Sequence, residues 1–67
     1  MTPARLAQVG QLLYGPAWRF ALADALRVNR RTIARWANGE YNIPEGIDDE
    51  IRQLLLSRRG QIDAELI

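Results

Sequence analysis

The stretch that decides the fold is residues 19–39, RFALADALRVNRRTIARWANG. Apolar side chains recur in it at helical spacing, first up to Leu26 and again around Ile33. Asn29 lies between the two runs and is a favourable N-cap, because its side chain can accept a hydrogen bond from an amide two or three residues further on. Gly39 supplies a left-handed residue that ends a helix. The stretch therefore predicts two short helices joined by a tight turn.

Helical signals continue before this stretch. Thr2-Pro3 is a good helix start, because threonine caps free amides and proline suits the first helical position. Gly15-Pro16 ends that first helix and opens a second, which we expect to run from about Pro16 to Leu26. Leu6, Val9 and Leu13 give the first helix its apolar stripe, with Leu12 beside them.

Helical signals also continue after it. The third helix should run from Asn29 to about Asn38, and Pro44 should begin a further helix whose first turns are acidic. Gly60 leaves open whether residues 44–66 form one helix or two. The other expected core positions are Trp18, Leu22, Ala23, Leu26, Ile33, Trp36, Ile47, Ile51, Leu54 and Leu55.

The length of 67 residues is that of one small domain, residues 1–67. The sequence has no internal repeat and no alternation typical of strands. We therefore expect an all-α fold, a compact four- to five-helix bundle with the two-helix stretch at its centre.

The composition excludes several functions. The chain has no cysteine and no histidine, which rules out disulfides, zinc fingers and Cys/His nucleophiles. The adjacent acids at 48–50 diverge by about 100° each around a helix, so they cannot share one metal ion. We predict no enzyme activity, no metal, no cofactor and no small-molecule ligand. No apolar run is long enough to span a membrane, and the N-terminus is a poor secretory signal, so we expect a cytoplasmic protein.

Charge is divided unevenly along the chain. The net charge is only +1, but residues 1–39 hold six arginines against one acid, while residues 40–67 hold three arginines against seven acids. All nine basic residues are arginine, whose guanidinium suits bidentate contacts with phosphate or guanine. An ordinary arginine-rich surface is the alternative explanation. The basic half favours a nucleic-acid partner.

The spacing within residues 19–39 fits a helix-turn-helix, in which one helix enters the DNA major groove while the other supports it. Counting Arg19 as the first position, the fourth, eighth, tenth, fifteenth and eighteenth should be apolar and the fifth small. The residues at these positions, in chain order, are Leu22, Ala23, Leu26, Val28, Ile33 and Trp36. The ninth position usually needs a positive φ and glycine. Here it is Arg27, so either Arg27 adopts a positive φ at a cost of roughly 1 kcal/mol or the turn has a different geometry.

These residues, with Arg31-Thr32, Arg35, Ala37-Asn38-Gly39 and Ile43-Pro44, resemble the Cro/repressor-type helix-turn-helix family of phage and bacterial regulators, whose fold is the lambda-repressor-like DNA-binding domain. The resemblance covers about residues 19–44. It implies that Arg30, Arg31 and Arg35 contact base edges, that Thr32 contacts a thymine methyl or a phosphate, and that Arg19 and Asn38 contact phosphates. The family more often has glutamine at the position of Arg19.

The residues give a consistent account on their own. Arg31 and Arg35 are four apart and share a helix face, while Arg30 is at the amino end that reaches deepest into the groove. Because arginine pairs with guanine, we expect a half-site that contains G. Further candidates for phosphate contacts are Arg27, Asn29 and Tyr41, of which Tyr41 is equally well explained as a half-buried loop aromatic.

The leading hypothesis is a small transcriptional regulator of phage or prophage type that represses by occupying an operator in double-stranded DNA. We expect a homodimer on two half-sites about 34 Å apart. The dimer could form through an apolar stripe that might equally pack on the monomer's own core: Ile51, Leu55, Ile62, Leu66 and Ile67. The alternatives are a protein-interaction module with the same fold and a DNA-binding fragment of a transposase or recombinase.

Overall fold

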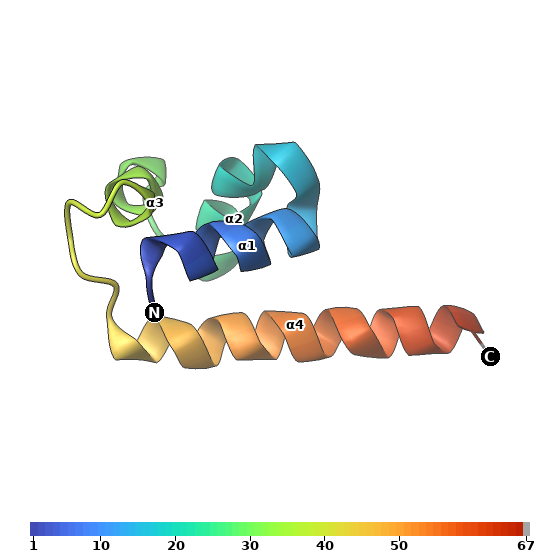
Figure 1. The fold of residues 1–67 in the computed structure, drawn as a ribbon. Coiled ribbons are helices and arrows are strands. Elements are labelled where there is room, and N and C mark those ends of the chain that lie inside the picture. Colours follow the sequence, from blue (N-terminus) through green and yellow to red (C-terminus); the bar gives the residue numbers. More distant parts are fainter. Residues whose placement is uncertain (67) are drawn as a thin grey trace.

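The computed structural model of the chain describes residues 1–66 and contains helices and no strands in that range. This confirms the all-α prediction. The elements are α1 (Pro3–Tyr14), the 3₁₀ turn η1 (Gly15–Ala17), α2 (Trp18–Leu26), α3 (Arg30–Ala37) and α4 (Glu45–Leu66) (Figure 1). None of these helices is both long enough and apolar enough to cross a bilayer.

The first three helices form a unit that rests on α4. α1 packs against α2 and α3, and α4 runs beneath α1 and α2 (Figure 1). α3 and α4 lie on opposite sides of the view, with α1 between them. One cluster of side chains joins all four helices: Leu6, Val9, Trp18, Leu22, Ala23, Leu26, Ile33, Trp36, Ile47 and Ile51. The predicted core positions of both tryptophans are thereby confirmed.

The predicted caps account for the helix starts. Thr2 Oγ1 accepts a hydrogen bond from the Arg5 amide (3.1 Å), and Asn29 Oδ1 accepts one from the Arg31 amide (2.8 Å). Each cap supplies an acceptor to an amide that has no partner within its own helix. Asn29 therefore fixes the start of α3 as the sequence predicts.

The ends of α2 and α3 have the same backbone geometry. At α2, Arg27 has φ 58°, and the amide of Val28 donates to the Ala23 carbonyl (3.0 Å). At α3, Gly39 has φ 78°, and the next amide donates back to the Arg35 carbonyl (2.9 Å). Both are Schellman closures, which require a left-handed residue directly after the helix. Of the two alternatives for the ninth position, Arg27 therefore adopts the positive φ, and the turn does not have a different geometry.

Three expected boundaries differ from the structure. α2 begins at Trp18, because residues 15–17 form the tighter 3₁₀ turn. α3 ends at Ala37 with Asn38 as its C-cap, and α4 begins at Glu45 rather than Pro44. Residues 45–66 form one helix without a break at Gly60, which settles that open point.

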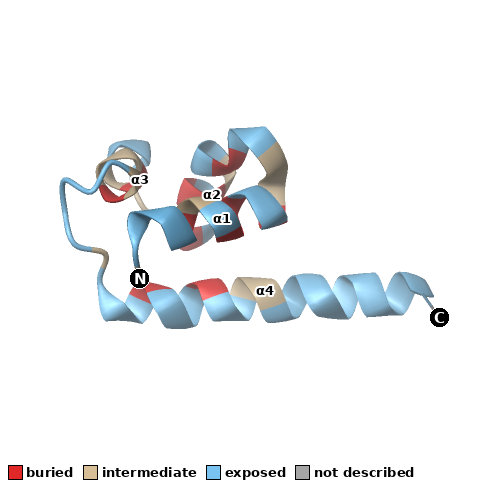
Figure 2. Cartoon of the chain, viewed as in Figure 1, coloured by how far each residue is buried: buried red, intermediate tan, exposed pale blue. Residues whose placement is uncertain are grey.

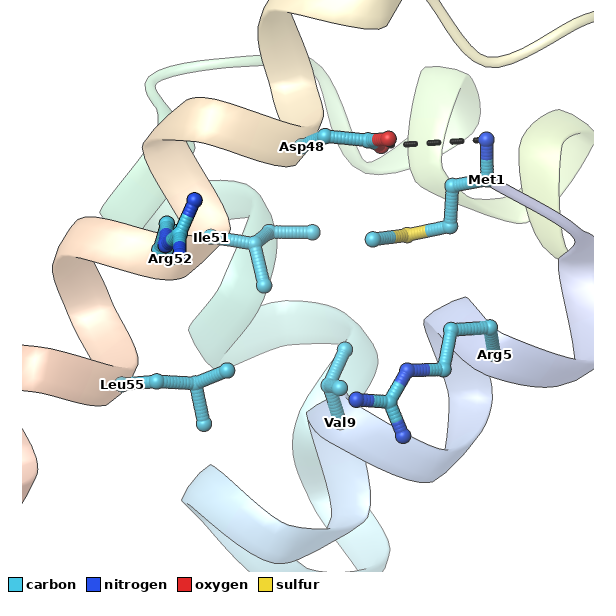
Figure 3. Close-up of a pocket in the computed structure, with 7 residues that line it drawn as sticks. All are labelled: Met1, Arg5, Val9, Asp48, Ile51, Arg52 and Leu55. Atoms are coloured by element: carbon cyan, nitrogen blue, oxygen red, sulfur yellow. Dashed lines mark ion pairs between the residues drawn. The ribbon is translucent and has the colours of Figure 1, made fainter.

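The amino-terminal half of α4 is fastened to the unit above it. Met1, Val9, Ile51 and Leu55 surround a hollow between α1 and α4, and the amino group of Met1 lies 3.7 Å from Asp48 Oδ1 (Figure 3). Beyond Leu55, every described residue of α4 is exposed (Figure 2). α4 is therefore anchored at one end only.

The predicted dimer stripe divides accordingly. Ile51 is 1% exposed and belongs to the monomer core, which is the alternative given for this stripe. Leu55 is half-buried against the same core. Ile62 and Leu66 are exposed by 51% and 80%, and Ile67 lies outside the described residues. Burial stops along α4 because α1, which covers its amino-terminal half, ends at Tyr14.

Candidate nucleic-acid interface

α3 has one buried side and one arginine-rich side. Ile33 and Trp36, which are 0% and 6% exposed, fasten the helix to the core. Around the helix, Arg31 and Arg35 lie on the side opposite these two residues, since each residue advances by about 100°. Arg31 is exposed and Arg35 is half-buried. The packing of α3 thus turns its cationic side outward.

Arg30, at the first position of α3, is stacked on an aromatic ring of α2. Its guanidinium carbon lies 4.5 Å from the centre of the Phe20 ring. Phe20 is 55% exposed, although it is a large apolar residue in a small protein. A guanidinium over an aromatic face is attracted by the ring quadrupole and is held in a narrower range of orientations. Phe20 therefore positions Arg30.

Sequence reasoning missed Phe20. A signal was present, because Phe20 lies outside the helical stripe formed by Trp18, Leu22 and Leu26, where an apolar residue has no core to enter. The contact of Phe20 with Arg30 was not predictable from this pattern, because it depends on how α2 and α3 cross.

Arg35 is stacked in a similar way at the other end of α3. Its guanidinium carbon lies 5.1 Å from the ring centre of Tyr41, in the loop after the helix. Tyr41 is 55% exposed, so it is not the half-buried loop aromatic of the alternative explanation. Two exposed aromatic rings thus hold two of the three arginines predicted to contact bases.

The remaining candidates surround these arginines. Arg19, at the start of α2, stacks at 5.4 Å on the ring of Trp18, and Arg27 is exposed in the turn. Asn38 is exposed at the end of α3, whereas Thr32 is half-buried. Asn29 uses its side-chain oxygen for the helix cap, which leaves its Nδ2 hydrogens as donors.

Within residues 1–66, the arginines of this surface form no ion pair with an acid. Among the described residues, ion pairs join the Met1 amino group to Asp48 and Arg59 to Asp63. Neither involves an arginine of α2, α3 or the turn between them. Within residues 1–66 no cluster of three or more potential metal-ligating side chains is present. The surface is therefore cationic and suited to an anionic partner.

No family model, curated protein or solved structure matches this chain.

Proposed function

We propose that this chain binds double-stranded DNA in a sequence-specific manner, with α2 and α3 as a helix-turn-helix and α3 as the recognition helix. The observation that carries the proposal is the outward side of α3, where arginines are held on aromatic rings while Ile33 and Trp36 fix the helix from below. A helix presented in this way has the dimensions and donors that fit the major groove.

In this proposal Arg30, Arg31 and Arg35 contact base edges. A guanidinium donates two parallel hydrogen bonds to O6 and N7 of guanine, so these arginines favour sites that contain G·C pairs. The stacks on Phe20 and Tyr41 reduce the conformational freedom that two of these side chains would lose on binding. Thr32, on the flank of the helix, provides a hydroxyl and a methyl group for a phosphate or a thymine.

Phosphate contacts would hold the recognition helix in register. Arg19 and Arg27 lie in α2 and the turn, and Asn29 and Asn38 lie at the two ends of α3. Tyr41 combines its stack with a hydroxyl that can donate to a phosphate. Contacts of this kind raise the affinity for DNA of any sequence and do not discriminate between sequences.

The biological role that fits such a module is transcriptional regulation by occupying an operator, most simply as a repressor of phage or prophage type. A homodimer would place two α3 helices on half-sites one helical turn, about 34 Å, apart. The two-fold symmetry of the protein would then match a palindromic operator.

The decisive experiment is selection of bound sequences from random duplex DNA, followed by fluorescence anisotropy on the enriched site. We expect enrichment of a G-containing half-site. Arg30→Ala should relax preference at one base-pair position, at a cost of about 1–3 kcal/mol, because a base contact is lost. Arg19→Ala should weaken binding to all sequences equally, since it removes a phosphate contact.

Arg52→Ala is the matched control, because Arg52 is an exposed arginine on α4, away from α3. It should leave both affinity and preference unchanged. Absence of binding to any duplex at low salt would contradict the proposal and favour the protein-interaction module. Binding without sequence enrichment would refute the specific readout assigned to α3.

A further inference from the structure

The last turns of α4 extend past the rest of the fold. Residues 56–66, named here the overhang, are exposed throughout, and α4 continues past the end of α1 (Figures 1 and 2). They give the molecule its long axis of 43 Å, against 23 and 20 Å in the other directions. A partner that covers the exposed apolar side chains of this segment would remove them from water, which is favourable.

The overhang continues the apolar side by which α4 binds its own core. Ile62 and Leu66 lie seven and eleven residues beyond Leu55, which returns them to nearly the same side of the helix. Both are exposed. Where the overhang meets the body, a hollow is lined by apolar and polar side chains: Leu13, Tyr14, Leu54, Ser57, Arg58 and Gln61. The overhang therefore starts beside a hollow of mixed polarity at the end of α1.

The charges on this side have opposite signs at its two ends. Arg58 precedes Ile62 and Glu65 follows it, seven residues after Arg58 and thus two turns away on the same side. Two turns span about 10 Å, so these two side chains are too far apart to pair within one helix. Arg59 and Asp63, four residues apart, do pair at 3.8 Å. Among residues 1–66, Arg58 and Glu65 have no ion-pair partner, so the side with Ile62 has one such charge of each sign, at a spacing suited to a copy of itself.

We propose that the overhang docks antiparallel on the overhang of a second copy of this chain. In this arrangement Ile62 packs near the two-fold axis, and Arg58 of each chain faces Glu65 of the partner subunit. Leu66 of the partner subunit lies opposite Ser57, at the mouth of the hollow. A parallel pair would instead place Arg58 against Arg58 of the partner subunit and like charges at Glu65, which is unfavourable.

The symmetry of this pairing is isologous, so the same surface is used on both chains and the assembly closes as a dimer. The interface is short, and we therefore expect weak association that remains reversible at micromolar concentrations. The inference goes beyond the proposed function, because the overhang lies at the end of α4 away from α3 (Figure 1). It rests on the overhang alone and is tested without DNA, so its failure is separate from failure of DNA binding.

The first test is sedimentation equilibrium of the chain without DNA, from about 1 μM to about 1 mM, which covers weak dimers. We expect a concentration-dependent monomer–dimer equilibrium. Ile62→Asp should raise the dissociation constant at least about tenfold, because it buries a carboxylate at the axis. Leu56→Asp is the matched control: Leu56 is also 51% exposed, but lies a third of a turn away around α4. It should leave the dissociation constant unchanged.

The second test exchanges the charges. Arg58→Glu and Glu65→Arg should each weaken self-association, because each leaves like charges facing each other. An equimolar mixture of the two variants should associate as a heterodimer, and the double variant should self-associate like the original chain. Circular dichroism shows whether each variant keeps its helices. A chain that stays monomeric at all concentrations, or equal effects of Ile62→Asp and Leu56→Asp, would overturn the proposal, and a double variant that fails to associate would overturn the antiparallel pairing.

Discussion

Arg27 has a left-handed backbone conformation that a residue with a Cβ rarely adopts. Within residues 1–66 it is the non-glycine residue with a positive φ, and the Schellman closure of α2 requires that φ. Gly39 meets the same requirement at the end of α3 without a clash of Cβ. The tertiary contacts of α2 and α3 therefore hold Arg27 in a conformation that is unfavourable for any L-residue with a side chain.

Replacing Arg27 by glycine should relieve this strain. We expect Arg27→Gly to raise the free energy of unfolding by up to about 1 kcal/mol relative to Arg27→Ala, which also removes the guanidinium but keeps the Cβ. Urea titration of the two variants measures the difference. Equal stabilities would mean that the left-handed conformation carries no net cost here.

Phe20 should control the mobility of Arg30. Phe20→Leu retains an apolar side chain but removes the ring over which the guanidinium lies at 4.5 Å. We expect the NMR order parameter of the Arg30 side chain to fall and its ring-current shifts to disappear, whereas Phe20→Tyr preserves both. Arg31 serves as the internal reference, and a comparable change there would indicate a general loosening of α3.

At the scale of elements, α1 and α2 approach each other closely at Gly10. Gly10 is buried in α1 against the indole of Trp18, and a Cβ at residue 10 would clash with Trp18 Cε3. Glycine is thus required there by packing. Gly46 and Gly60 in α4 have open space where a Cβ would be. The same residue type therefore has opposite effects in the two helices.

Alanine substitutions should separate these effects. Gly10→Ala forces the two helices apart or displaces the indole, and we expect a loss of about 1–3 kcal/mol in the free energy of unfolding. Gly60→Ala should instead increase helicity and add up to about 1 kcal/mol to the stability of the helix. Thermal and urea unfolding measure both variants. Tolerance of Gly10→Ala would mean that α1 and α2 pack less tightly than their contacts indicate.

At the scale of the whole molecule, the uneven charge along the sequence becomes a separation in space. In Figure 1, α3, which belongs to the basic half, lies above the start of α4, which belongs to the acidic half. Although the net charge is only +1, the side that carries α3 is basic, and we expect a polyanion to bind on that side.

Salt dependence tests this arrangement. If α3 and its flanks bind DNA, the logarithm of the binding constant should fall with that of the salt concentration by about 0.9 for each phosphate neutralised. Arg19→Ala should reduce the slope by about one phosphate, and Arg52→Ala should not change it. A slope near zero for the original chain would contradict binding through the arginine surface.

Much of the fold was predictable, because its determinants are local. Thr2, Asn29 and Gly39 fix helix ends through hydrogen bonds that reach only a few residues. The spacing of apolar residues predicted the core, whereas the sequence left open whether Arg27 adopts a positive φ, which the structure shows. The arginines of the candidate site followed from their place on one helix, whereas Phe20 did not, because its partner comes from another helix.

The sequence by itself determined which segments are helical and which side of each helix is apolar, since these depend on near neighbours. Only the tertiary structure decided which parts of an apolar stripe are covered. Ile51 and Ile62 lie on the same side of α4, yet one is in the core and the other is exposed. The physical reason is the length of α1. It ends at Tyr14 while α4 continues, and no local pattern in α4 determines the length of the helix that packs on it.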